Sequence, residues 1–256
     1  MDLKGKVSLV TGGAGGIGVK VCEKLASLGS FVYVCDIREA TELVDRINAK
    51  YQELRAASAK CDISNRENVE AMYSRISQQR GGVDILVNNA AVYGPSKANR
   101  FPEISYEDFI KTIQVDLSGA VYCTLLAIPY MKQKGWGRIV FTAAPMSSSG
   151  IPSPYLAGKA GFIGLTKYLS RRFGGDGIRT FALALRHVDT PLIRKVIASR
   201  GRDVEEGVKA MHKKSLTGRM ITPEEVADVY AHFISASSPR ISGAVILTEG
   251  GITYLR

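Results

Sequence analysis

The chain has 256 residues, of which 45% are hydrophobic and 23% charged, and its formal net charge is +10. These values are ordinary for a globular protein and exclude a disordered or low-complexity chain. No linker or repeat interrupts the sequence, so we expect residues 1–256 to form one domain. The sequence shows no basic recognition motif, so we interpret the charge as favouring solubility or attracting an acidic ligand rather than nucleic acid.

The first ten residues run directly into a strand pattern and leave no room for a signal peptide. The longest apolar stretch, roughly residues 119–131, is too short to span a bilayer, so we interpret it as a core helix. Four cysteines are scattered without metal-ligand spacing: Cys22, Cys35, Cys61 and Cys123. We therefore expect a cytoplasmic protein with buried free thiols, no membrane partner and no bound metal.

Strand-like apolar runs alternate with amphipathic helical patterns. In chain order we expect strand 6–11, helix 16–28, strand 31–36, helix 39–54, strand 57–61, a helix after residue 64, strand 83–88, helix 105–132, strand 138–142, helix 155–172, strand 178–185, a helix from residue 222 and strand 244–248. This alternation indicates βαβ units. The predicted fold class is α/β, a Rossmann-type doubly wound parallel sheet in a three-layer αβα arrangement.

Three predicted helix starts carry capping signals. Ser64 and Glu67 fit a Ser-x-x-Glu capping box, and Ser105 has Asp108 at the equivalent position. Residues 222–225, Thr-Pro-Glu-Glu, place a proline in the first turn of the next helix.

A glycine-rich segment, residues 11–18, joins the first strand to the first helix. It fits G-x-G-x-x-G through Gly13, Gly15 and Gly18, and T-G-x-x-x-G-x-G through Gly12, Gly16 and Gly18, with Ile17 inside the turn. Glycines let backbone N–H groups approach a pyrophosphate, and a helix N-terminus favours its negative charge. Because the segment lies at the first strand-to-helix junction, we favour a dinucleotide site over a plain glycine-rich turn.

Asp36 ends the second predicted strand, where a carboxylate can accept hydrogen bonds from the adenosine ribose hydroxyls. It would repel a 2′-phosphate by about 4 kcal/mol per charge pair at ~4 Å and an effective dielectric of ~20, before salt screening. Half of that repulsion favours NAD over NADP roughly 30-fold. Arg38 is the competing feature, since an arginine can accommodate the phosphate. The predicted cofactor is NAD(H).

Motifs along nearly the whole chain resemble the short-chain dehydrogenase/reductase family. They are residues 11–18, Asp36, Cys61-Asp62-Ile63, Asn88-Asn89-Ala90-Ala91, Gly137-Arg138-Ile139-Val140, Tyr155-Leu-Ala-Gly-Lys159, Asp189-Thr190-Pro191 and Glu249-Gly250-Gly251. The resemblance implies an oxidoreductase and assigns three parts of the cofactor site. It places the adenine beside Asp62 and Ile63, the cofactor ribose beside Asn88 and Ala90, and the nicotinamide carboxamide near Val188 and Thr190.

Tyr155 and Lys159 are the predicted catalytic residues, and both also belong to the predicted cofactor site. They lie four residues apart on a predicted helix and so share one face. A free tyrosine has a pKa of about 10, and a nearby ammonium lowers it. We expect Tyr155 to take a proton from an alcohol during oxidation, or return it during reduction.

Several functional positions of the family are altered in this chain. The catalytic serine falls on Ala144, the active-site asparagine on Asp116, the sixth-strand asparagine on Phe181, the proline-glycine pair beside the nicotinamide on Leu185-Arg186, and the last glycine of Asn-Asn-Ala-Gly on Ala91. Losing one donor to a reacting oxygen costs a factor of about 10²–10³ in rate. Thr142, Ser147 and Ser148 are candidates to replace the hydroxyl. Asp116 would stabilise a nearby Lys159 ammonium while repelling a tyrosinate, and the sequence leaves the balance open.

Arg186 and His187 add two cationic candidates beside the expected nicotinamide site. They either bind an anionic substrate, supply acid/base chemistry or point to solvent, and the sequence does not choose among these. Residues at about 190–218 form a predicted substrate lid with a solvated charged face.

Three functions remain open at this point. The first is an NAD-dependent dehydrogenase or carbonyl reductase of a small molecule, and Tyr155 with Lys159 favours it. The second is a non-redox enzyme on the same fold, such as a lyase, dehydratase, cyclase or isomerase, which Ala144 and Asp116 favour. The third is a catalytically inactive binding protein. The family resemblance implies a homotetramer built through the helices on either side of the fifth strand.

Overall fold

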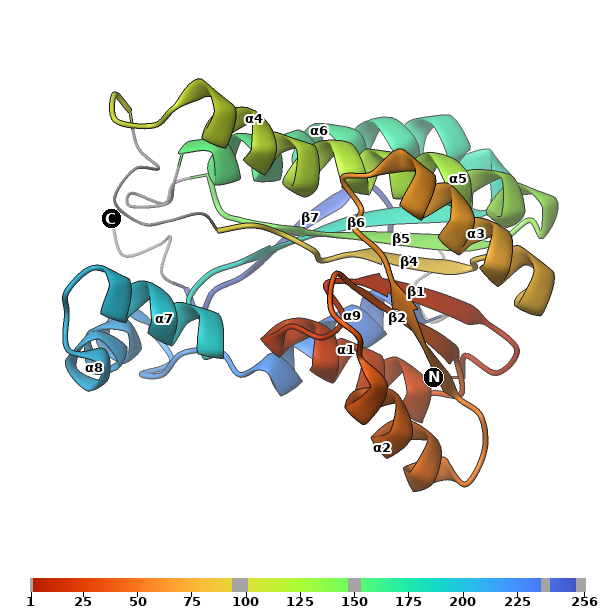
Figure 1. Cartoon of the computed structure of the whole chain (residues 1–256), viewed down its shortest axis with the longest axis horizontal. Helices are drawn as coiled ribbons and strands as arrows, with labels where there is room; N and C mark the ends of the chain where they lie inside the picture. The colour runs from red at the N-terminus through yellow and green to blue at the C-terminus, as the bar shows by residue number, and fades with distance from the viewer. Residues whose placement is uncertain (1, 94–100, 147–152, 236–239, 252–256) are drawn as a thin grey trace.

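The computed structural model describes residues 2–93, 101–146, 153–235 and 240–251. Within these residues, parallel strands form one seven-stranded sheet in the order β3-β2-β1-β4-β5-β6-β7 (Figure 1). The strands are β1 (Val7–Thr11), β2 (Phe31–Asp36), β3 (Ala56–Lys60), β4 (Ile85–Asn88), β5 (Gly137–Ala143), β6 (Ile178–Leu185) and β7 (Ala244–Thr248). The predicted parallel α/β sheet is confirmed.

Helices cover both faces of the sheet (Figure 1). One face carries α1 (Gly16–Ser27), α2 (Thr41–Tyr51) and α9 (Pro223–Ile234). The other carries α3 (Arg66–Arg80), α4 (Tyr106–Ile113), α5 (Ala120–Gln133) and α6 (Ser153–Phe173), followed by the short η2 (Gly174–Asp176). Two further helices, α7 (Pro191–Ser199) and α8 (Val204–Lys214), lie at the end of the sheet where the strands finish.

The direction in which the chain winds reverses at β1, which pairs with β2 on one side and β4 on the other. Thr11 at the end of β1 is in register with Cys35 of β2 and with Asn88 of β4. The carboxyl ends of three strands therefore meet at one edge. In open parallel sheets, the crevice outside such a reversal is where ligands bind.

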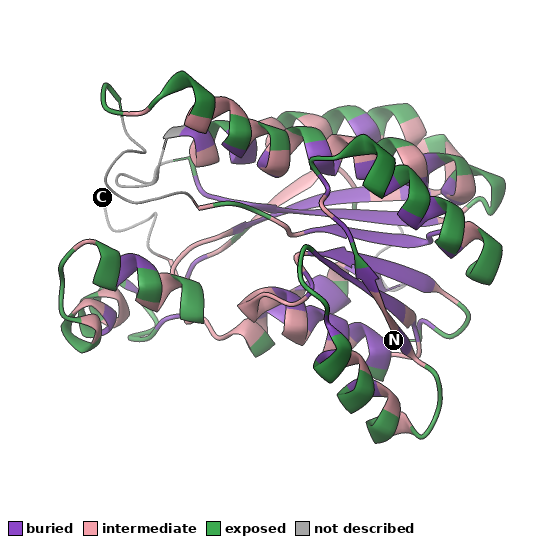
Figure 2. Cartoon of the chain, viewed as in Figure 1, coloured by how far each residue is buried: buried purple, intermediate pink, exposed green. Residues whose placement is uncertain are grey.

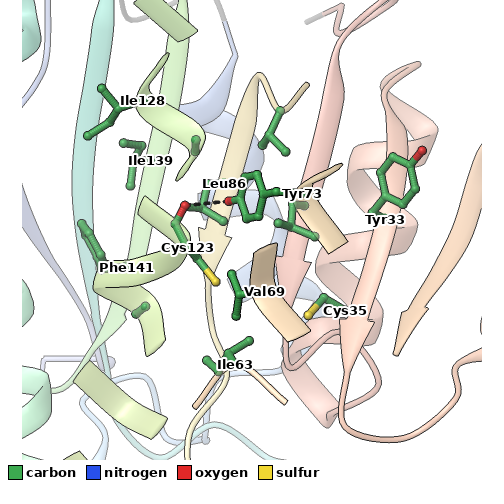
Figure 3. Packing of buried hydrophobic residues seen from close by; sticks show 14 of the residues in the cluster. Tyr33, Cys35, Ile63, Val69, Tyr73, Leu86, Cys123, Ile128, Ile139 and Phe141 are labelled. Carbon is green, nitrogen blue, oxygen red and sulfur yellow. Dashed lines mark hydrogen bonds between the residues drawn. The ribbon is translucent and has the colours of Figure 1, made fainter. Parts of the chain in front are cut away.

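The hydrophobic core has one cluster on each face of the sheet, and Figure 2 shows the buried strands between half-exposed helices. In the cluster under α3, α5 and α6, the Tyr73 hydroxyl donates a 2.7 Å hydrogen bond to the Cys123 carbonyl (Figure 3). This bond satisfies a phenol that would be costly to bury unpaired. Phe141 of β5 stacks on Phe162 of α6 with ring centroids 4.8 Å apart. All four cysteines are buried, as expected.

The predicted cap of α3 is wrong by one residue. Asn65, not Ser64, caps the helix, and its side chain accepts from the Asn68 N–H at 3.0 Å. Ser64 instead donates through its N–H and hydroxyl to Asp62 Oδ1, at 2.9 and 2.7 Å. The Asp62 carboxylate thus competes successfully for the serine, as aspartates at turns commonly do. The other capping signals fare better: Ser105 accepts from the Asp108 N–H, and Thr222 with Glu225 forms a full capping box.

The predicted helix over residues 105–132 is not uniform. Between α4 and α5 lies a π-helical segment, η1 (Gln114–Gly119), which contains Asp116. The continuous helical run Tyr106–Gln133 is long and apolar enough to cross a membrane by length and composition, which the shorter apolar stretch did not suggest. In the structure 44% of its apolar window is buried, and that side packs on β4, β5 and α6.

The predicted lid, residues 190–218, contains the helix pair α7 and α8. Thr190 caps α7 by accepting from the Ile193 N–H, and Asp203 caps α8 by accepting from the Glu206 N–H at 2.8 Å. Ile197, Val208 and Met220 form a small hydrophobic cluster of their own. These helices therefore have little core in common with the sheet, which suits an element that covers a site.

Candidate active site

A continuous groove follows the carboxyl ends of the strands. Its first section is lined by residues that include Asp36, Asp62, Ile63 and Ala90. A central section shares Gly12, Asp36 and Ala90 with it and extends to Tyr155 and Lys159. A terminal pocket shares Ile17, Tyr155 and Thr190 with the central section and adds Val188. The groove brings together all the predicted cofactor and catalytic residues except Gly18 and Asn88.

The glycine turn provides a close backbone approach at the middle of the groove. Gly12 has φ +64°, and a Cβ there would lie 2.8 Å from Ala90 Cα. A Cβ on Gly18 would lie 2.1 Å from the Gly12 carbonyl oxygen, so Gly18 acts by letting α1 close on the turn rather than by lining the groove. Within the described residues no side chain caps α1 at Gly15, and its first turn carries no acidic residue. This N-terminus fits a pyrophosphate.

Asp36 lies at the edge of the groove and is 8% exposed. Its carboxylate accepts from the Ala14 N–H at 3.2 Å and from the Arg38 N–H at 3.1 Å. The Arg38 guanidinium reaches back to Asp36 at 3.4 Å and also donates to the Ala14 carbonyl. Arg38, which the sequence analysis considered as a partner for the 2′-phosphate of NADP, is therefore an exposed cation paired with the Asp36 carboxylate.

Asn88, which the resemblance places beside the cofactor ribose, is buried at the end of β4. Its side chain donates to Thr124 Oγ1 at 3.1 Å, and Asn88 is not among the described residues that line the groove. The neighbouring Asn89 fills a positioning role that the sequence did not reveal. Its amide donates to the carbonyls of Thr11 and Gly12, and its N–H donates to Thr11 Oγ1. These bonds tie the end of β4 to the glycine turn.

Lys159 is fully buried in the central section, with Nζ 5.2 Å from the centroid of the Tyr155 ring. Among the described residues Nζ has no hydrogen-bond partner. Burial lowers the pKa of Lys159 to about 8, although the Asp116 carboxylate opposes that shift. A buried ammonium without a hydrogen-bond partner is costly, so this lysine is poised to receive a ligand group.

The expected lowering of the Tyr155 pKa is not found. Burial is the main cause of a pKa well above the ordinary value, and the Asp116 carboxylate raises it further. Desolvation disfavours the phenolate more strongly than the nearby ammonium favours it. In the protein alone, Tyr155 is therefore held as a neutral phenol.

The surroundings of Asp116 show how it acts on Lys159 and Tyr155, a balance that the sequence left open. It is fully buried, its Oδ1 accepts from the Val92 N–H at 2.6 Å, and its Oδ2 has no partner among the described residues. The π-helical turn and the lack of a side chain at Gly158 bring η1 and α6 together here, since a Cβ on Gly158 would lie 3.1 Å from Asp116 Cβ. Asp116 supports the Lys159 ammonium and opposes a tyrosinate at the same time.

Ala144 follows β5 directly, is buried and lines the terminal pocket beside Tyr155. Of the candidate replacement hydroxyls, Thr142 lines the pocket but contacts Asn89 Oδ1 and the Tyr230 hydroxyl. Ser147 and Ser148 lie outside the described residues. Tyr93, which the sequence reading missed, lines both the central section and the terminal pocket. Its ring centroid lies 5.1 Å from that of Tyr155.

Arg186 and His187 also line the terminal pocket. His187 has φ +52°, and its Nδ1 is buried without a partner among the described residues. Burial, with Arg186 and Lys214 adding to it, lowers the pKa of His187 to about 4. Of the two predicted cations, only Arg186 is therefore charged at neutral pH.

Comparisons with known proteins identify the family to which the chain belongs. A family model described as enoyl-(acyl carrier protein) reductase matches residues 12–253. The D-beta-hydroxybutyrate dehydrogenase of Cupriavidus necator is 31% identical over 256 residues, covering 97% of this chain and 98% of that enzyme. The chain belongs to the short-chain dehydrogenase/reductase family.

Other members of the short-chain dehydrogenase/reductase family match over almost their full length. The cis-4-hydroxycyclohexanecarboxylate dehydrogenase of Sinomonas cyclohexanicum is 31% identical over 250 residues, covering 97% of this chain and 96% of that enzyme. The 3-oxoacyl-(acyl-carrier-protein) reductase of Thermotoga maritima is 31% identical over 259 residues, covering 98% and 99%. The structure of levodione reductase superposes with a TM-score of 0.93 at 23% identity, over 99% and 100% of the two chains, which shows the shared fold. This short-chain dehydrogenase/reductase is an oxidoreductase.

Proposed function

We propose that this protein is an NAD(H)-dependent oxidoreductase that interconverts a hydroxyl and a carbonyl group on a small anionic molecule. The observation that carries the proposal is the position of Tyr155, which lines both the central section and the terminal pocket. The Tyr155 side chain, with Lys159 Nζ beside its ring, thus borders both the proposed cofactor path and the substrate space. That placement is what proton transfer coupled to hydride transfer requires.

NAD(H), when bound, would supply or accept the hydride. The chain's own residues would hold it by backbone N–H groups at Gly12–Gly18, by Asp36 at the adenosine ribose and by Asp62 and Ile63 at the adenine. The choice of NAD over NADP rests on Asp36, whose negative charge opposes a 2′-phosphate. Val188 and Thr190 border the far end of the same path.

The neutral state of Tyr155 supports a specific proton step. A phenol held neutral by burial and by Asp116 is ready to donate its proton to a carbonyl oxygen as hydride arrives at the carbon. In the reverse direction, Tyr155 must first lose that proton. Lys159, beside the ring, supplies the positive charge that favours this loss. Oxidation should accordingly need a higher pH than reduction.

An anionic substrate is supported by Arg186 in the terminal pocket and by the net charge of +10. Two relatives are named for acidic compounds, a hydroxybutyrate and a hydroxycyclohexanecarboxylate.

We also propose a homotetramer. Leu125 on α5 and Tyr168 on α6 are exposed apolar side chains on the helices that flank β5, and both would be covered by a partner copy. Light scattering at micromolar concentration should give a tetramer, and a monomer would refute this assembly.

The reaction is tested by screening ketones and secondary alcohols, neutral and acidic, with NADH and NAD. We expect nicotinamide absorbance changes that are larger with NAD(H) than with NADP(H), faster reduction than oxidation at pH 7, and oxidation that accelerates as the pH rises. Tight NADH binding without turnover of any compound would contradict the proposed reaction.

A further inference from the structure

The terminal pocket is lined by two chemically different groups of side chains. Tyr93, Ala144 and Tyr155 line the part of it where the reaction is proposed to occur. Arg186, which follows β6, and Arg200, which follows α7, line the same pocket. Among the described residues that line this pocket there is no aspartate or glutamate. Four apolar side chains of the lid belong to the same lining: Leu192, Ile193, Val196 and Met211.

The lid concentrates the positive charge of the chain. Residues 190–218 contain seven lysines and arginines and three carboxylates, a net charge of +4 out of the total of +10. Arg194 forms ion pairs with Asp189 and Glu205 and is not part of the pocket lining, whereas Arg200 is. The described lining of the pocket thus contains two arginines and no carboxylate, a composition that favours an anionic ligand.

His187 adds a further polar atom to the lining of the terminal pocket. His187 Nδ1 is buried without a partner in the described part of the chain, and the pocket is lined by the same residue. The positive charges of Arg186 and Lys214 lower the pKa of this imidazole, and the buried Glu249 carboxylate raises it. A polar atom left unpaired at a pocket wall is what a ligand oxygen or N–H would satisfy.

We propose that the substrate is a hydroxy or oxo carboxylic acid whose carboxylate is bound by Arg200 and Arg186 while its hydroxyl or carbonyl faces Tyr155. This rests on the proposed oxidoreductase function and deepens it by naming the substrate class. Guanidinium groups bind carboxylates through paired N–H···O bonds, which fix orientation as well as supply attraction. Since Arg200 belongs to the lid, the carboxylate also links α7 to the end of β6. The apolar side chains that line the pocket suit the carbon chain that joins the two functional groups.

Matched acid and ester pairs provide the test. The probes are straight-chain oxo monocarboxylates with the carbonyl at position 2, 3 or 4, and the methyl ester of each. Reduction by NADH is measured for the native enzyme, Arg200→Gln, Arg186→Gln and the control Arg194→Gln, which removes a lid cation outside the pocket. We expect the native enzyme to prefer at least one acid to its ester. Arg200→Gln should lower kcat/KM for that acid roughly 10- to 100-fold, mainly through KM, and change the ester less than about threefold.

The control and the salt dependence sharpen the outcome. Arg194→Gln should leave the ratio of kcat/KM for the acid to that for its ester unchanged. Raising the salt concentration should lower kcat/KM more for acids than for esters. Equal turnover of acids and esters, or Arg200→Gln and Arg186→Gln variants that retain the native ratio, would overturn the proposal.

A binding measurement separates this proposal from the reaction itself. In the NADH complex, butanoate should raise the melting temperature of the native enzyme more than butanamide does, and Arg200→Gln should abolish the difference. If neutral and acidic ketones alike fail to oxidise NADH, the proposed reaction fails, and the melting comparison still decides whether the pocket binds carboxylates. Equal shifts with butanoate and butanamide would reject the carboxylate site whatever the reaction.

Discussion

The Asp116 carboxyl lies close enough to Lys159 that each side chain favours the charged form of the other, although both are fully buried. Burial acts in the opposite direction on each group and is the larger effect. It raises the pKa of Asp116 to about 6 and lowers that of Lys159 to about 8. The same carboxylate raises the pKa of Tyr155. One acidic side chain thus supports the lysine and holds the tyrosine neutral.

This relationship predicts a pH-dependent loss of stability. The folded state keeps the Asp116 proton up to about pH 6, whereas an unfolded aspartate has released it near its ordinary value of 3.8. Between these values the folded state binds more protons, so the free energy of unfolding falls as the pH rises, by about 3 kcal/mol in total. The Asp116→Asn variant lacks this pH-dependent contribution to the free energy of unfolding.

Urea unfolding of the native protein and Asp116→Asn at half-unit steps from pH 4 to pH 6.5 measures the effect. Across this range, the free energy of unfolding of the native protein should fall relative to that of the variant as the pH rises. Parallel stability curves would mean that Asp116 does not titrate as its burial predicts. In kinetics, the same variant should shift the rise in oxidation rate to lower pH, because a charge that opposes tyrosinate is gone.

Tyr155→Phe should abolish turnover and leave the affinity for NADH nearly unchanged. The phenol is the proposed proton carrier, whereas the proposed nucleotide contacts lie mainly at the glycine turn and Asp36. Steady-state kinetics and calorimetry measure the two quantities. Tyr106→Phe is the control, since it removes an exposed tyrosine hydroxyl from α4 and should behave as the native enzyme. Substantial redox activity in Tyr155→Phe would reject the proton role.

Ala144→Ser should raise kcat if the rate is limited by a missing donor to the reacting oxygen. The added hydroxyl would enter the pocket wall next to Tyr155, where one donor is worth a factor of about 10² or more. Reduction of one identified substrate is compared at saturating NADH for the two proteins. An unchanged or lower kcat, with the melting temperature preserved, would show that another group already supplies the donor. Tyr93→Phe then tests the nearest described alternative.

The native protein should bind NADH at least tenfold more tightly than NADPH, because the Asp36 carboxylate repels a 2′-phosphate. Asp36→Asn should reduce the difference in affinity between the two nucleotides, because it strengthens NADPH binding and weakens NADH binding. Arg38→Ala in the native background is the control for the cation that lies over the carboxylate. Calorimetry with both nucleotides on the three proteins measures the preference. Tighter NADPH binding that is lost in Arg38→Ala would reverse the assignment.

Features encoded by short stretches of sequence were the most predictable. The strand ends at Thr11 and Asp36, the glycine turn between them and the capping box at Thr222 all follow from local composition and spacing. Parallel pairing then brings those strand ends to one edge without further information. This is why most of the cofactor path could be located from the sequence.

What the sequence did not predict depends on contacts between distant segments. The π-helical turn at Asp116 arises where η1 meets α6 and the Val92 N–H, and no local pattern marks it. The neutral state of Tyr155 depends on how completely the folded chain removes water. Arg200 reaches the pocket only because α7 folds back over it. The sequence also did not reveal that Ser64, which was predicted to cap α3, would instead donate a hydrogen bond to the Asp62 carboxylate.

Transfer of labelled hydride tests the central claim most directly. NADH deuterated at the transferable position is incubated with the native enzyme, with Tyr155→Phe and with an oxo acid that the screen has identified, and the product is examined by mass spectrometry. We predict a hydroxy acid carrying one deuterium from the native enzyme and none from Tyr155→Phe, with both proteins binding NADH equally. A converted product without deuterium, or labelled product formed equally by Tyr155→Phe, would contradict the account.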